Sequence, residues 1–89
     1  MIVEFVTAAE QELDGAVTYY ELQQPGLGVQ FALEVGHAVQ RILEYPRAWQ
    51  ALPGGTRRCL LRRFDYGLMY KIRNDVATVS AVMHLKRRP

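Results

Sequence analysis

The first 45 residues carry an apolar pattern that predicts one short strand followed by two helices. Met1–Val6 is rich in β-branched residues, as strands are. Beyond it, apolar residues recur at the helical spacing of three and four, at Leu13, Ala16, Val17 and Tyr20. Pro25-Gly26 then ends this first predicted helix.

A second helical pattern follows and ends near Tyr45, because the residue before Pro46 is disfavoured in the α region. Its apolar stripe consists of Leu27, Phe31, Val35, Ala38, Val39 and Ile42. The opposite, polar face holds Gln30, Glu34, His37, Arg41 and Glu44. The segment Pro46–Thr56 contains Pro53-Gly54-Gly55 and predicts a loop held in place by Trp49.

The last third of the chain predicts three strands, Arg57–Arg63, Gly67–Arg73 and Val76–Met83. Asn74-Asp75 fits a two-residue hairpin turn, because both residue types tolerate positive φ. This turn would pair Arg73 with Val76 and set the register of the last two strands.

Alternation along these strands separates an apolar sheet face from a basic one. The apolar face holds Leu68, Tyr70, Ile72, Ala77, Val79 and Ala81. The other face holds Met69, Lys71, Arg73, Thr78, Ser80 and, if the register holds to the end, His84. A four-residue loop at Phe64–Gly67 adds Cys59 and Leu61 to the first face, and Arg58, Leu60 and Arg62 to the second. An odd loop length would exchange Arg58 and Arg62 for Arg57 and Arg63.

The predicted fold is therefore α+β, with element order β-α-α-β-β-β. A helical hairpin packs on one face of a mostly antiparallel twisted sheet, and residues 1–89 form a single domain. The apolar face packs on the helices, which leaves the basic face toward solvent.

Charge is divided unevenly along the chain. Residues 1–45 carry seven acidic side chains and one basic one, whereas residues 46–89 carry ten basic and two acidic ones. Such a division indicates a surface for nucleic acid or an acidic partner. The candidate binding residues of this basic face and of the basic C-terminus are Arg58, Arg62, Lys71, Arg73, Lys86, Arg87 and Arg88. The alternative is a solvated face whose charges discourage edge aggregation.

The remaining composition narrows the class of protein. A lone cysteine, Cys59, excludes an internal disulfide, and we expect it to be a small core residue. The N-terminus does not resemble a signal peptide, and Val76–Met83 is too short to span a bilayer, so we expect a soluble, cytoplasmic protein without membrane partners. His37 and His84 are too dispersed to indicate a metal site, and no cofactor is expected.

His84, at the end of the last predicted strand, is a candidate acid or base because the free pKa of histidine lies near neutrality. The alternative for a single histidine is a structural role. A repressor of the helix-turn-helix class is not expected, because the second helix is acidic or apolar apart from Arg41 and could not enter a DNA groove.

Several motifs occur in an order that resembles a known family. They are Tyr19-Tyr20-Glu21, Gly26-Leu27-Gly28 followed by Phe31, Pro46 with Trp49, Arg57-Arg58, the run from Arg62-Arg63-Phe64-Asp65-Tyr66-Gly67 to Tyr70, and the closing His84, Arg87-Arg88-Pro89. Together they resemble the RelE/ParE superfamily of toxins from type II toxin–antitoxin modules, also called plasmid-stabilisation proteins. The resemblance covers essentially the whole chain, and that family's fold has the same element order.

The resemblance implies a growth inhibitor, neutralised by an antitoxin whose binding segment is acidic and amphipathic. ParE-like members poison DNA gyrase, whereas RelE-like members are ribosome-dependent mRNA endonucleases. The RelE pattern has an arginine at the position of Gly67 and a C-terminal tyrosine, which this chain lacks, and these departures favour the ParE-like activity. If the chain is a nuclease, the resemblance makes His84, Arg62 and Arg87 the catalytic candidates. A third possibility is a non-toxic or decayed module that binds nucleic acid.

Overall fold

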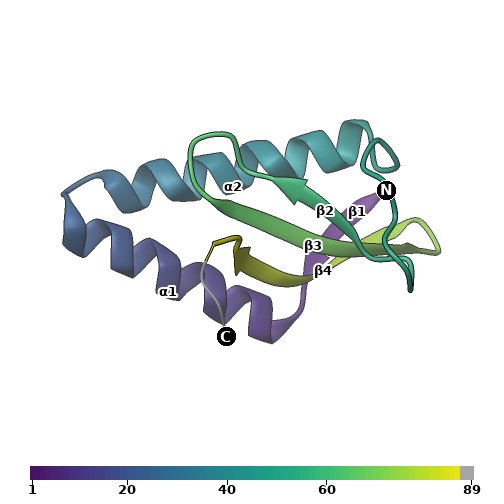
Figure 1. Ribbon diagram of the computed structural model, residues 1–89, viewed down its shortest axis with the longest axis horizontal. Coiled ribbons are helices and arrows are strands. Elements are labelled where there is room, and N and C mark those ends of the chain that lie inside the picture. The colour runs from purple at the N-terminus through teal and green to yellow at the C-terminus, as the bar shows by residue number, and fades with distance from the viewer. Residues whose placement is uncertain (87–89) are drawn as a thin grey trace.

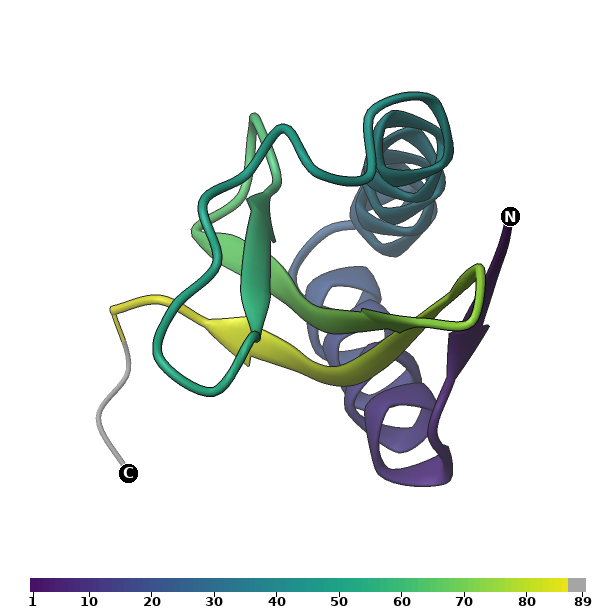
Figure 2. The same cartoon turned by 90° about the vertical axis from the view of Figure 1, so that its right-hand side faces the viewer.

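The computed structural model describes residues 1–86 and has the predicted order of elements. They are β1 (Ile2–Phe5), α1 (Thr7–Gln23), α2 (Leu27–Glu44), β2 (Arg57–Leu60), β3 (Tyr66–Arg73) and β4 (Val76–His84). The strands lie in the order β1-β4-β3-β2, with β1 parallel to β4 and the other pairs antiparallel. Both helices cover one face of this mixed sheet, and no helix within residues 1–86 covers the other (Figures 1 and 2).

The two helices form a tight hairpin at the predicted Pro25-Gly26 break. Gly26 has a left-handed conformation with φ of 88° and is the N-cap residue of α2. The carboxylate of Glu21 on α1 accepts the backbone N–H groups of Gly26 at 2.8 Å and of Gly28 at 3.0 Å. Glu21 therefore satisfies N–H groups at the start of α2 that the helix itself leaves unpaired. Gly28 lies so close to α1 that a Cβ there would be 2.5 Å from the Val17 carbonyl oxygen.

An aromatic cluster joins the helices to the sheet and to the loop before β3. Tyr20 of α1 and Phe31 of α2 contact each other and both contact Phe64 and Tyr66, with ring centroids between 4.9 and 6.2 Å apart. Such ring contacts stabilise a fold beyond the burial of their area. The predicted apolar face continues this core, with buried side chains at Cys59, Leu61, Leu68, Tyr70, Ala77 and Val79. Trp49, half-buried against the same core, fixes the α2–β2 loop as predicted.

The predicted hairpin turn is confirmed. Asn74 and Asp75 have φ of 50° and 64°, and Arg73 pairs with Val76. The register then shifts once, because Tyr70 pairs with Val79 while Met69 pairs with Ala81. Ser80 is the additional residue of a β-bulge, and one extra residue exchanges the two faces of the strand beyond it.

The prediction for the last part of β4 was therefore wrong. Beyond the bulge Val82, not Ala81, is the buried residue that faces the helices. His84 pairs with Tyr66, and their ring centroids lie 5.0 Å apart, so His84 is on the helix-facing side and not on the basic face. β1 ends opposite Val79, and the Glu12 carboxylate of α1 accepts the Val82 N–H at 2.9 Å just beyond it.

The strand predicted at Arg57–Arg63 was too long, because β2 ends at Leu60. Arg62 therefore lies in the β2–β3 loop rather than on a sheet face. Glu34, predicted on the polar face of its helix, is instead only 9% exposed. Its Oε1 atom accepts the backbone N–H groups of Arg62 at 3.2 Å and Arg63 at 3.3 Å, which turns the chain away from the sheet.

Candidate target-binding surface

The helix-free side of the sheet, here called the outer face, combines cationic and apolar side chains. The register aligns Arg58 of β2 with Met69 and Ala81, and aligns Leu60 with Gly67 and Met83. Lys71 and Arg73 continue β3 on the same side, toward the hairpin. Leu60 and Met83 are each 45% exposed, so this face is as much apolar as basic.

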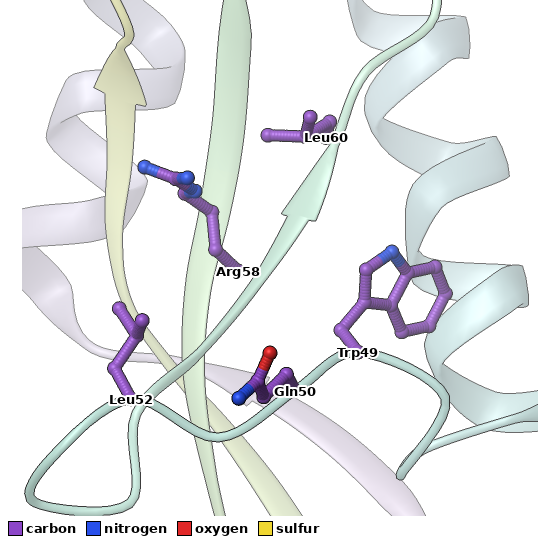
Figure 3. A pocket seen from close by; sticks show the side chains of 5 residues that line it. All are labelled: Trp49, Gln50, Leu52, Arg58 and Leu60. Carbon is purple, nitrogen blue, oxygen red and sulfur yellow. The ribbon is translucent and has the colours of Figure 1, made fainter.

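A shallow hollow of about 340 Å³ lies at the β2 end of the outer face. Trp49, Gln50 and Leu52 of the preceding loop line it together with Arg58 and Leu60 of β2. Figure 3 shows the Arg58 side chain extending from β2 over β3, between Leu52 and Leu60. The hollow thus offers apolar contact beside a guanidinium, whose planar fork suits carboxylate or phosphate groups.

The Arg57 side chain holds the loop that lines this hollow. It donates hydrogen bonds to the carbonyl oxygens of Arg47 and Trp49, which ties the α2–β2 loop to the start of β2. Arg57 is therefore a structural cation, in contrast to its neighbour Arg58. Within residues 1–86, no acidic side chain forms an ion pair with Arg58, Lys71 or Arg73.

Gly67 occupies the outer-face position where the RelE pattern has an arginine. A Cβ at Gly67 would lie 3.1 Å from Cγ of Arg58 and 3.4 Å from side-chain carbons of Leu60 and Leu85. These three side chains cover the glycine. A long side chain at this place would have to displace them. The outer face could therefore accept an arginine at position 67 only if these three side chains moved.

A second cationic region lies at the far end of the sheet from the hairpin, on the β2–β3 loop. Arg62 and Arg63 are exposed there, and the guanidinium of Arg63 donates to Oε1 of Gln30 at 2.8 Å. Lys86 pairs with Asp65 of the same loop at 3.5 Å, so its charge is partly compensated. Arg87 and Arg88 lie outside the described residues.

The structure describes two of the three catalytic candidates, His84 and Arg62, and they lie on different elements. His84 packs against Tyr66 on the helix-facing side, and its Nδ1 accepts the Lys86 N–H at 3.1 Å. Arg62 projects from a loop, while Arg58 and Lys71 lie on the outer face. The bulge in β4 is what separates His84 from the outer-face cations.

Cys59 and Tyr70, which are buried between the sheet and the helices, have shifted pKa values. Burial raises the pKa of the Cys59 thiol, although the nearby Arg41 and Arg62 guanidinium groups oppose the shift. Burial also raises the pKa of Tyr70, whose hydroxyl donates to the Pro46 carbonyl at 2.7 Å. Both groups stay protonated at neutral pH, and Cys59 is the core residue that its sequence context predicted.

Sequence reasoning missed the three glutamates of the helices that accept backbone N–H groups. Glu12 binds β4, Glu21 binds the start of α2, and Glu34 binds the β2–β3 loop. All three belong to the acidic half of the chain. The partners of Glu12 and Glu34 lie 28 to 70 residues away, so no local spacing could have revealed them, whereas Glu21 binds groups five and seven residues away across the turn between the helices.

Comparison with known proteins identifies the family. The family model described as "ParE toxin of type II toxin-antitoxin system, parDE" matches residues 3–89. The chain belongs to the ParE toxin family. A solved structure described as the chromosomal ParDE toxin–antitoxin system from P. aeruginosa has the same fold, with a TM-score of 0.83 over 97% of both chains at 13% identity. A search of curated protein sequences gave no match.

This ParE-family protein is the toxin component of a type II toxin–antitoxin module, and an antitoxin is its partner. The alternatives, a RelE-like mRNA endonuclease and a decayed nucleic-acid-binding module, are not favoured. Neither helix within residues 1–86 has the length and apolar character needed to cross a membrane.

Proposed function

We propose that this ParE-family toxin poisons DNA gyrase by docking on it through the outer face. The observation that carries the proposal is the mixture of unpaired cations and exposed apolar side chains on this face. A surface that neutralises phosphates needs the cations alone. Exposed Leu60, Met83 and Leu52 around Arg58 instead match the centre of a protein–protein interface, where apolar residues and arginine are enriched.

The arrangement of the candidate residues supports binding over cleavage. A nuclease needs an acid–base group within hydrogen-bond reach of the group it protonates, beside cations that stabilise the transition state. Here His84 lies on the helix-facing side, and Gly67 is covered by Arg58, Leu60 and Leu85. The proposal therefore gives Arg58 and Lys71 a docking role rather than a catalytic one.

Supercoiling of relaxed plasmid by purified gyrase tests the proposal directly. The wild-type toxin should inhibit supercoiling, and the double variant Arg58→Gln with Lys71→Ala should require about tenfold more protein, because interface charges of this kind contribute about 1–2 kcal/mol. Gln at 58 keeps the part of the stem that covers Gly67. Arg47→Ala removes an exposed cation of the α2–β2 loop that does not line the hollow, and it should leave inhibition unchanged.

The opposite pattern would support the endonuclease. It would consist of normal supercoiling together with cleaved mRNA on translating ribosomes. Pulse labelling in bacteria gives the same distinction in cells. Early loss of thymidine incorporation indicates gyrase, and early loss of methionine incorporation indicates mRNA cleavage.

We also propose that the antitoxin places an acidic, amphipathic segment on the same outer face and so excludes the target. The unpaired Arg58, Lys71 and Arg73 would attract its carboxylates, and the hollow would accept one of its apolar side chains. Both proposed partners act in the cytoplasm. The dissociation constant of the complex should rise steeply between low and high salt, because exposed charge pairs are screened. An affinity insensitive to ionic strength would exclude this docking site.

A further inference from the structure

We propose that Glu34 is a positioning residue that holds the β2–β3 loop so that Arg62 is presented to the toxin's target. The proposal rests on the toxic function given above, though not on gyrase being the target. Glu34 is only 9% exposed, and the carboxylate accepts two successive N–H groups of the loop, those of Arg62 and Arg63. A buried carboxylate is costly unless it is hydrogen-bonded, so its presence needs an explanation.

The two N–H groups converge on a single oxygen atom, Oε1, at 3.2 and 3.3 Å. Successive backbone N–H groups that converge in this way form a concave anion site. In this protein the carboxylate of Glu34, a residue of α2, occupies the site. Bonds to an ionised acceptor are stronger than those between neutral groups, so the carboxylate fixes the backbone of the loop firmly.

Other contacts hold the loop on both sides of Arg62. Before it, the Arg41 guanidinium donates to the Leu60 carbonyl at 2.8 Å, and after it the Arg63 guanidinium donates to Gln30 at 2.8 Å. Phe64 packs on Phe31 in the aromatic cluster. The Asp65 carbonyl accepts the Leu85 N–H at 2.8 Å, which joins the loop to the residue that follows β4.

Arg62 differs from its neighbours in this loop. Its backbone is anchored, but its guanidinium makes no hydrogen bond or ion pair with any side chain among residues 1–86. The Glu34 carboxylate binds the backbone through Oε1 and lies 3.9 Å from His37 Nδ1 through Oε2, and it forms no ion pair with that guanidinium. A cation on a rigid loop loses little further entropy on binding, which favours its use in recognition.

A double-mutant cycle between Glu34 and Arg62 tests the proposal. Its readout is the amount of soluble toxin per cell that halves the growth rate, so a change in expression or solubility does not affect it. Glu34→Ala and Arg62→Ala should each raise this amount about tenfold. The double variant should also be about tenfold weaker, not a hundredfold, because residues that act as a unit are not additive. Glu34→Gln, which keeps an acceptor oxygen, should restore most of the potency.

Glu21→Ala is the matched control. Glu21 also accepts two backbone N–H groups, but at the start of α2. The Glu21→Ala change should lower the melting temperature to a degree similar to Glu34→Ala without changing the potency of the soluble protein. Additive effects of Glu34→Ala and Arg62→Ala, or an unchanged potency in either single variant, would overturn the proposal. If the effects of Glu34→Ala and Arg62→Ala are coupled but the wild-type toxin does not inhibit gyrase, the role of Glu34 stands and gyrase is rejected as the target.

Discussion

The two faces of the sheet come from the same strands but show opposite relations between charge and burial. On the helix-facing side, Leu68, Tyr70 and Val79 are fully buried under the two helices. On the outer face lie Arg58 of β2 and Lys71 of β3. Neither has an acidic partner within residues 1–86. The first face accounts for the stability of the fold, and the second is left available for a partner.

Three glutamates of the acidic half of the chain have structural roles. Glu12, Glu21 and Glu34 do not pair with the cations of the outer face but accept backbone N–H groups. The outer-face cations are therefore not neutralised within the described fold. The uneven charge distribution of the sequence therefore includes three carboxylates with structural roles and three outer-face cations, Arg58, Lys71 and Arg73, without an acidic partner within residues 1–86.

The largest effect should come from opening the helix-facing core. Phe31 is fully buried and contacts Tyr20, Phe64 and Tyr66. Phe31→Ala should lower the free energy of unfolding by about 3–5 kcal/mol, because it removes a large buried ring and leaves a cavity. Urea denaturation measures this loss. Leu22→Ala, at a residue 81% exposed, should change it by less than about 0.5 kcal/mol, and equal effects would refute the assignment of the core.

The close contact between the helices should produce a smaller effect. Gly28→Ala should lower the free energy of unfolding by about 1–3 kcal/mol, since the new Cβ meets the Val17 carbonyl of α1. Gly36 lies in the same helix, and apart from its chain neighbours and the helix's own backbone no atom lies within 4 Å of a new Cβ. Gly36→Ala should therefore stabilise the protein by about 0.5–1 kcal/mol. Thermal unfolding of the pair measures the difference, and a stable Gly28→Ala variant would show that the helices can separate freely.

Alkaline pH should lower the stability of the protein through two buried groups of the helix-facing side. The folded protein holds the protons of Cys59 and Tyr70 more tightly than the unfolded chain does, because burial raises both pKa values. The unfolded state therefore loses protons first, and stability falls as pH rises above the ordinary values of 9.0 for the thiol and 10.0 for the phenol. Melting temperatures measured across pH 8–11 should decline in this range. Cys59→Ala should delay the start of the decline, and an unchanged profile would count against burial of the thiol.

The smallest effect on stability should come from the outer face. Lys71→Ala and Arg73→Ala, both at exposed positions, should each change the free energy of unfolding by less than about 0.5 kcal/mol. The same variants should weaken antitoxin binding at low salt. Denaturation curves and titrations at two ionic strengths measure the two quantities. A clear loss of stability would mean that these cations support the fold, and the contrast between the faces would then fail.

The order of elements and the core were accessible from the sequence because they depend on local periodicity. Helical spacing located α1 and α2, and alternation placed Leu68, Tyr70, Ala77 and Val79 on the buried face. Asn74-Asp75 predicted the hairpin, since few residue types adopt positive φ. The ordered motifs also led to the family that the comparison confirmed.

Some features were decided only when distant segments came together. The bulge at Ser80 moved His84 across the sheet, and no residue type in β4 signals that additional residue. Glu34 lies among the polar residues of its helix, and it is buried because loop N–H groups from 28 and 29 residues away needed an acceptor. Periodicity reports which side of an element is apolar. Only the tertiary structure decides which polar groups meet, because hydrogen bonds depend on distance in space and not on spacing in the chain.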